Sequence, residues 1–305
     1  MQSTRRTFLQ AGVAAPLLAD APKLRPIRLG GPIFLKSEDP RELAREHRRL
    51  GYSAAYCPPA AVTDSDKIRA IREGFAAENV VISEVGAWKN MLDPDSAARA
   101  ANLSYVIERL ALADTVGARC CVDIAGSYNP KLWYGPDPKN VTEQFLDATA
   151  ENCRKVIDQV KPRNTKFSIE MMPWNLPDGP ESYIALMRAV DRVAFGVHMD
   201  VCNVINSPRR YYNNSAVISE CFQKLGKWIL SCHAKDLEWM AEYNVHFREV
   251  VPGRGKVNYS TYLRELAALP VEAPLMLEHL KTAEEYEEGR NYIRRVGGEI
   301  GVTFV

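Results

Sequence analysis

Four short apolar runs of this chain each end in a side chain that can bind a metal ion. The runs are 167–170, 197–200, 230–233 and 276–278, and their last residues are Glu170, Asp200, His233 and Glu278. A polar loop and then a helical pattern follow each run, which is typical of buried strands in a βα repeat. The steps of 30, 33 and 45 residues between these four side chains suit parallel βαβ units of roughly 30 residues.

Parallel strands would bring these four side chains to one edge of a sheet, and in a closed barrel that edge is the mouth where active sites are built. Three carboxylates and one imidazole around a common point repel one another unless a cation lies among them. A single carboxylate at a strand end is more often a helix cap or an ion-pair partner, but four consecutive strand ends favour ligands. We therefore expect one divalent metal ion; the oxygen-rich ligand set suits Mn²⁺ or Mg²⁺ and does not exclude Zn²⁺.

The rest of the chain alternates strand and helix signals. Strands are expected at 27–34, 53–57, 80–85 and 119–124, and helices at 39–50, 64–78, 93–116 and 141–160. With the four runs above this makes eight strands and no linker, which predicts an α/β fold, a single-domain (β/α)₈ TIM barrel over residues 25–302. A doubly wound sheet would need a glycine-rich phosphate turn after its first strand, and Gly30-Gly31-Pro32 is not one.

The first 22 residues differ in composition from the barrel. Arg5 and Arg6 precede Phe8 and Leu9, a weakly apolar stretch follows, and Ala19-Asp20-Ala21 matches a small-x-small cleavage site. This pattern predicts a twin-arginine signal, which would export the folded protein to the periplasm. The alternative is a frayed N-terminus on a cytoplasmic protein. No later run approaches the roughly 18 apolar residues of a membrane span.

Composition narrows the range of partners. The chain has 305 residues, 39 basic and 38 acidic, and a net charge of +1. Because the two signs are evenly spread, we expect a small-molecule partner rather than nucleic acid or an anionic membrane. Seven scattered cysteines do not form a disulfide pattern. A homo-oligomer is compatible with the sequence.

Three motifs around the last two strands resemble a known family. His233-Ala234-Lys235-Asp236 matches a His-x-Lys-Asp motif, the glycine loop 252–259 is similar to Pro-Gly-x-Gly-x-Val/Ile, and Glu278 ends the last strand. Together they resemble the xylose isomerase-like superfamily of sugar isomerases, epimerases and dehydratases over residues 25–302. The resemblance implies a barrel whose divalent ion is held by Glu170, Asp200, His233 and Glu278 and binds adjacent oxygens of a sugar-like substrate.

The chain departs from the ketose 3-epimerases of this superfamily at three positions. Asn203 replaces a histidine, Leu176 replaces a second glutamate, and Trp239 replaces an arginine. An asparagine can hydrogen-bond a substrate hydroxyl but does not titrate near neutral pH as histidine does.

The ligand set points to chemistry on a carbon next to a carbonyl. A metal that chelates the carbonyl and a neighbouring hydroxyl makes the α-proton easier to remove. Glu170 and Glu278 could face opposite sides of that carbon as acid and base. Return of the proton gives isomerisation or epimerisation. Loss of a β-substituent makes the enzyme a lyase or hydratase of keto-sugars or 3-keto-glycosides, and a non-catalytic sugar-binding protein is a remote third reading.

Aromatic residues suggest a carbohydrate substrate. Trp88, Trp133, Trp174 and Trp239 follow four of the expected strands at the mouth, and the long loop 126–140 could act as a lid. Such rings can stack on the apolar face of a sugar, although they could also only pack over the end of the barrel.

Several polar residues complete the predicted substrate site. By strand alternation His198 shares a side with Asp200, whereas His279 should face away from Glu278 and pack against helices. Lys235 could hold a substrate oxygen or pair with Asp236. Arg254 could bind a carboxylate or a phosphate, although a solvated loop arginine is the more common case. Asn203 could hydrogen-bond a substrate hydroxyl.

Overall fold

The structure is a computed structural model that describes residues 24–305. The predicted export signal, residues 1–22, lies outside the described residues and stays a prediction. Within residues 24–305 no helix combines the length and the apolar character that crossing a membrane requires.

Eight parallel strands form a closed barrel, which confirms the predicted single-domain TIM barrel. Around the barrel the strands follow the order β1-β10-β7-β6-β5-β4-β3-β2, so each barrel strand lies beside the barrel strands before and after it in the chain, and β10 closes the ring against β1. The strands are β1 (Leu29–Gly30), β2 (Ala54–Tyr56), β3 (Val81–Gly86), β4 (Cys120–Ile124), β5 (Lys166–Glu170), β6 (Phe195–Asp200), β7 (Ile229–Ala234) and β10 (Leu275–Leu277).

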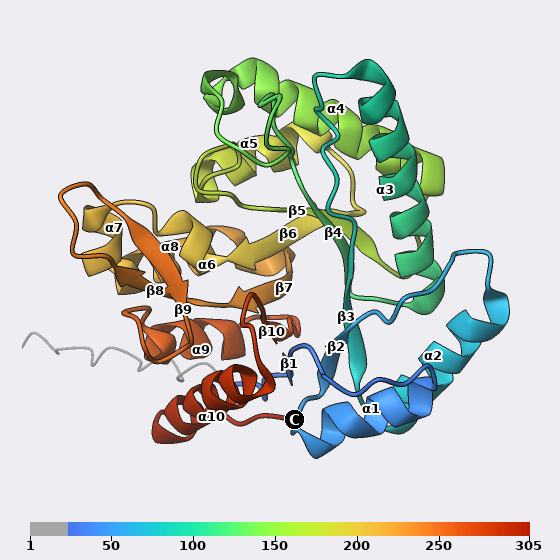
Figure 1. The fold of residues 1–305 in the computed structure, drawn as a ribbon, viewed down its shortest axis with the longest axis vertical. Helices are drawn as coiled ribbons and strands as arrows, with labels where there is room; N and C mark the ends of the chain where they lie inside the picture. Colours follow the sequence, from blue (N-terminus) through green and yellow to red (C-terminus); the bar gives the residue numbers. More distant parts are fainter. Residues whose placement is uncertain (1–23) are drawn as a thin grey trace, which may run out of the picture.

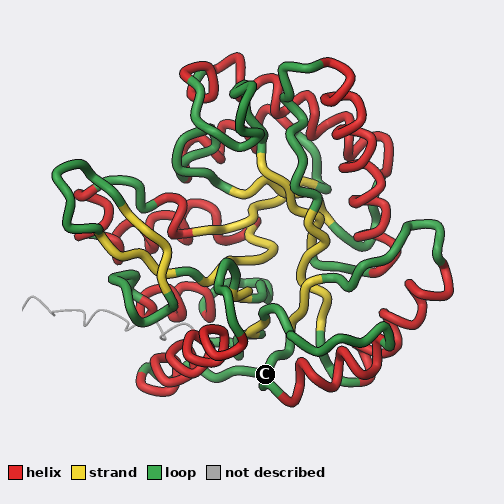
Figure 2. Tube along the Cα trace, viewed as in Figure 1, coloured by secondary structure: helices red, strands yellow, loops and turns green. Residues whose placement is uncertain are grey.

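Helices surround the barrel, and Figure 1 shows them outside the strands, as does the tube view in Figure 2. The helices after the eight strands include α1 (Pro40–Arg49), α2 (Ser65–Ala77), α3 (Ser96–Val116), α4 (Glu143–Val160), α5 (Pro180–Val190), α8 (Asn214–Leu225), α9 (Tyr259–Ala267) and α10 (Ala283–Glu299). Shorter helical pieces are η1 (Pro138–Val141), α6 (Val201–Val204), α7 (Pro208–Tyr212) and η2 (Gly226–Trp228).

Local sequence signals set the ends of several helices. The side chains of Asp39, Asp64 and Asp95 accept hydrogen bonds from backbone N–H groups in the first turns of α1, α2 and α3. Gly117 ends α3 in the left-handed conformation, with φ of 76°, which costs glycine little. Thr142 caps α4, so this helix starts two residues later than predicted because 138–141 forms a separate 3₁₀ turn.

Strand register aligns the predicted ligands at one end of the barrel. Asp200 on β6 lies directly opposite His233 on β7, and His233 lies opposite Met276 on β10. Glu170 on β5 lies opposite His198 on β6. Since all these strands are parallel, the carboxyl ends of β5, β6, β7 and β10 meet at one mouth.

Two features were not anticipated from the sequence. The first strand, expected at 27–34, is only Leu29–Gly30; Pro32, which follows closely, has no N–H to donate to a neighbouring strand. An antiparallel hairpin of β8 (Asp236–Trp239) and β9 (Phe247–Val250) follows β7 outside the barrel. It packs beside α7, where Tyr211 stacks on Phe247 at a centroid distance of 5.1 Å.

Candidate metal centre and mouth of the barrel

Glu170, Asp200, His233 and Glu278 meet at the mouth. Each offers one ligand atom, and these four atoms lie within 4.8 Å of one another. His233 Nδ1 lies 2.9 Å from Glu278 Oε1, 3.2 Å from Glu170 Oε1 and 3.7 Å from Asp200 Oδ2. The structure thus brings together all four residues that the sequence singled out.

This geometry fits a bound divalent cation. An imidazole Nδ1 can donate only one hydrogen bond, yet three carboxylates gather around it. Asp200 Oδ2 and Glu278 Oε1 are buried without a well-aligned hydrogen bond, and the Lys235 ammonium lies 2.6 and 2.8 Å from them. One ammonium offsets only part of the charge of three carboxylates, and a divalent cation would compensate the rest. Three hard oxygen donors with one imidazole suit Mn²⁺ or Mg²⁺ and are compatible with Co²⁺ or Zn²⁺.

Lys235 supplies a positive charge at the edge of this cluster. Its side chain is 3% exposed, and Nζ lies 2.6 Å from Asp200 Oδ2 and 2.8 Å from Glu278 Oε1. Glu249, from β9, approaches the same ammonium at 3.3 Å. Lys235 therefore pairs with the ligand carboxylates and not with its neighbour Asp236, and it offsets part of their mutual repulsion.

Local structure orients the ligands. Oδ1 of Asp200 caps the short helix α6 by accepting hydrogen bonds from the N–H groups of Cys202 and Asn203, which turns Oδ2 toward the cluster. On β7, the hydroxyls of Tyr262 and Tyr259 donate to the carbonyls of His233 and Lys235 at 2.8 and 2.9 Å. Helix α9 thereby holds the end of β7 in place.

The three carboxylates differ in basicity. Burial raises the pKa of Glu170, and the nearby Glu278 charge raises it further. Although burial alone would raise them, the pKa of Asp200 is held well below its usual range by Lys235 and His233, and these two cations lower the pKa of Glu278 to about 2. Glu170 is consequently the most basic of the three.

A second buried network lies beneath the cluster. Glu84, on β3, is 1% exposed, and its Oε2 lies 3.2 Å from His233 Nε2 while its Oε1 lies 3.0 Å from His198 Nε2. The Ser231 hydroxyl donates to the same carboxylate. A carboxylate on the far nitrogen of a metal-binding histidine fixes the ring orientation and directs Nδ1 toward the metal.

The mouth opens into a cavity of about 600 Å³. Predicted residues on its wall are Trp88, Trp133, Trp174, Asn203 and Lys235, together with Glu170 and Glu278. Trp174 donates its indole N–H to the Tyr134 carbonyl at 2.6 Å, and Tyr134 packs edge-on against Trp133 at 5.3 Å. The loop 126–140 and the loop after β5 are thus joined above the cluster.

Four other predicted residues lie away from this cavity: His198, Trp239, Arg254 and Asp236. His198 is fully buried inside the barrel beside His233, with a ring separation of 4.1 Å. Trp239, on the hairpin, packs against aromatic rings of α7 and β9. Arg254 is exposed, pairs with Glu288 at 2.6 Å and lines a neighbouring cavity of about 350 Å³.

The Asp236 side chain holds backbone segments together. It is 1% exposed, and its carboxylate accepts hydrogen bonds from the N–H groups of Leu237, Gly253, Gly255 and Val257. It holds the glycine loop and lies outside the mouth cavity.

Sequence patterns missed three residues of this site. Glu84 could have been noticed as a charged residue within the apolar strand 81–86. Glu249 gave no signal, because its hairpin was not expected. The prediction for His279 was wrong: β10 ends at Leu277, alternation stops there, and His279 takes a left-handed φ of 59° that turns it to the cavity, where Nδ1 lies 2.8 Å from Glu249.

Comparisons with known proteins agree with this architecture. A family model described as xylose isomerase-like TIM barrel matches residues 44–296. A search of curated proteins finds no match.

Solved structures show the same fold at low sequence identity. A xylose isomerase-like TIM barrel protein from Mycobacterium smegmatis in complex with magnesium has a TM-score of 0.63 and 20% identity, covering 85% of this chain and 88% of its own. The 3-keto-D-glucoside 4-epimerase from E. coli gives 0.61 and 12%, covering 89% and 100%. A probable 3-DHS dehydratase from Bacillus anthracis gives 0.62 and 14%, covering 87% and 97%.

Proposed function

Because the chain belongs to the xylose isomerase-like TIM barrel family, we propose that it is a divalent-metal-dependent isomerase or epimerase of a sugar-like substrate. One observation carries the proposal. Two buried carboxylates, those of Glu170 and Asp200, and the half-buried carboxylate of Glu278 converge on one nitrogen of His233. An aromatic-walled cavity large enough for a small organic ligand lies next to them. The match to a 3-keto-D-glucoside 4-epimerase agrees with a carbohydrate substrate.

Glu170, Asp200, His233 and Glu278 would hold the ion, with Mn²⁺ preferred. When bound, the ion polarises a substrate carbonyl and acidifies the neighbouring C–H group. Glu170 would remove this proton, since its side chain lines the cavity. The Asn203 amide donates to Glu170 Oε1 at 3.1 Å and so orients it.

Return of a proton to the other side of the substrate carbon is assigned to Glu278, which first takes one up from solvent because its lowered pKa leaves it ionised. It lines the same cavity as Glu170. The Lys235 ammonium, 2.8 Å from Glu278, stabilises negative charge that develops on the substrate oxygen. The rings of Trp88, Trp133 and Trp174 cover the cavity and limit the access of water.

A lyase or hydratase of keto-sugars or 3-keto-glycosides is the second candidate. Asn203 stands where the ketose 3-epimerases carry a histidine, and the fold is shared with a probable dehydratase. In this reading the same proton abstraction is followed by loss of a β-substituent. The remote alternative is a sugar-binding protein without catalysis.

Substitution at the cluster tests the proposal. His233→Ala and Glu278→Gln should each lose the bound metal and turnover while the circular dichroism spectrum stays that of a folded barrel. Glu288→Gln, an exposed acid on α10, is the matched control and should keep both. Metal content is measured on the purified proteins, and turnover on a panel of keto-sugars and 3-keto-glycosides.

The assay also separates the candidates. Exchange of the α-proton with solvent deuterium without release of a group supports the isomerase or epimerase, whereas release of a leaving group supports the lyase. Full metal content and activity in His233→Ala would refute the metal site. Sugar binding without turnover under any divalent ion would leave only the binding protein.

A further inference from the structure

A second large cavity lies at the opposite end of the barrel from the metal centre. Its volume is about 780 Å³, and its walls include the starts of β3, β5 and β7 and the end of α2. Because the barrel strands are parallel, strand starts and the metal-binding strand ends lie at opposite ends. This cavity is therefore separate from the proposed active site.

Positive charge is concentrated in this cavity. Five cationic side chains line it, Arg72, Arg119, Arg163, Lys166 and Lys227, against a single carboxylate, Glu272. That carboxylate is already shared by Arg28, at 3.1 Å, and Arg119, at 2.5 Å. The whole chain has a net charge of only +1, so this excess is local.

Most of these cations have no acidic partner. Within residues 24–305 no ion pair involves Arg72, Arg163, Lys166 or Lys227. Lys227 lies instead over the ring of Trp228, at 4.1 Å from its centroid. Like charges around one hollow repel one another, and a bound anion relieves that repulsion.

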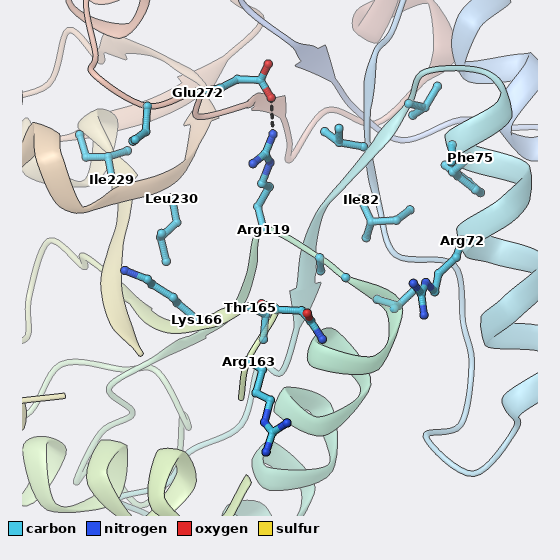
Figure 3. A pocket seen from close by; sticks show the side chains of 18 of the residues that line it. Arg72, Phe75, Ile82, Arg119, Arg163, Thr165, Lys166, Ile229, Leu230 and Glu272 are labelled. Atoms are coloured by element: carbon cyan, nitrogen blue, oxygen red, sulfur yellow. Dashed lines mark hydrogen bonds and ion pairs between the residues drawn. The ribbon is translucent and has the colours of Figure 1, made fainter. Parts of the chain in front are cut away.

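The cations are spread around the cavity. Figure 3 shows Arg119 turned toward Glu272, Arg72 projecting from α2 on another wall, and Arg163 and Lys166 extending in different directions. Apolar side chains such as Ile82 and Leu230 line the space between them. A compact anion can contact only part of this arrangement, whereas an extended one can reach several of the cations.

An unsatisfied hydroxyl belongs to the same wall. Thr165 is 6% exposed, and its Oγ1 has no hydrogen-bond partner among the described residues. Buried hydroxyls are normally paired, so a ligand oxygen would complete the site.

We propose that this cavity binds an extended small-molecule anion of the linear polyphosphate type, with negative groups at separate positions. Arg72 and Lys166 would hold separate groups, and Arg119, which is held by its ion pair with Glu272, would provide a further contact. Guanidinium and ammonium groups are the usual partners of phosphate oxygens.

Isothermal titration calorimetry on the full chain tests this with tripolyphosphate and orthophosphate as probes. Tripolyphosphate should bind about tenfold or more tightly than orthophosphate, because it can contact cations that a single phosphate cannot reach together. Arg72→Gln and Lys166→Gln should each weaken tripolyphosphate binding by about threefold to tenfold. Arg69→Gln is the matched control, since Arg69 lies on the same helix but pairs with Asp66.

The outcomes are distinct. Loss of affinity in Arg72→Gln and Lys166→Gln, with none in Arg69→Gln, supports the site. Equal affinity for the two phosphates, or no binding of tripolyphosphate at about 5 mM, overturns it. Binding that neither substitution affects also overturns it, because the anion then lies elsewhere, for example at the candidate metal centre. Tighter binding of a single-stranded oligonucleotide than of tripolyphosphate overturns the small-molecule assignment.

Discussion

Replacing Glu84 by glutamine should weaken metal binding although Glu84 is not among the proposed ligands. The carboxylate is buried, and its two oxygens lie 3.2 Å from His233 Nε2 and 3.0 Å from His198 Nε2. Although burial alone would raise it, the pKa of Glu84 is held well below its usual range by these two histidines. Glutamine keeps the shape of the side chain and removes its charge.

The expected loss follows from the role of this contact. Removing the carboxylate partner of a metal-binding histidine typically costs about 10- to 100-fold in metal affinity, or about 1.4 to 2.7 kcal/mol. Without the charge of Glu84, His233 is less basic and its ring is less firmly oriented toward Glu170, Asp200 and Glu278. The effect should therefore appear in the Kd for Mn²⁺ before any effect on the fold.

Competition with a chelator of known affinity measures this Kd. The matched control is Asp123→Asn, which also converts a fully buried carboxyl to an amide but has its hydrogen bonds with Lys89 and Ile124 rather than with the cluster. Its Kd should equal that of the unmodified protein. If Glu84→Gln binds Mn²⁺ within about twofold of the unmodified protein, well below the typical range, the supporting role assigned to Glu84 is wrong.

Two further predictions concern stability and reactivity. Burial raises the pKa of Asp123 well above its usual value, so the folded protein keeps a proton that the unfolded chain releases above pH of about 4. Because of this group, the free energy of unfolding should fall by about 1.4 kcal/mol per pH unit as pH rises toward the folded pKa. Urea denaturation at pH 5 and pH 7 measures this fall, which should be smaller in Asp123→Asn than in the unmodified protein. An equal fall in the two proteins would contradict the assignment. Burial raises the pKa of Cys57, the least buried of the seven cysteines, to about 11. Iodoacetamide at pH 7.5 should therefore label the native protein slowly, and it should label the urea-unfolded protein at all seven thiols. Rapid labelling of Cys57 in the native state would refute this.

The sequence determined the fold class and the positions of the proposed ligands, because both depend on short-range patterns. Apolar runs fix where strands form, and a residue at the end of a strand reaches the mouth of a parallel barrel whatever the details of packing. Glu170, Asp200, His233 and Glu278 therefore come together as predicted. The caps of α1 and α3, at Asp39 and Gly117, are equally local signals.

Only the tertiary structure decided which other side chains reach that mouth. Glu249 lies on a hairpin outside the barrel and contacts Lys235. His279 turns toward the cavity at a point where strand alternation has ended. Trp239 packs against the aromatic rings of α7 and so lies away from the mouth. Glu84 supports His233 from a strand 149 residues away in the chain. Such contacts depend on the closure of the barrel and on loop conformation, which bring together residues whose local sequences carry no information about one another.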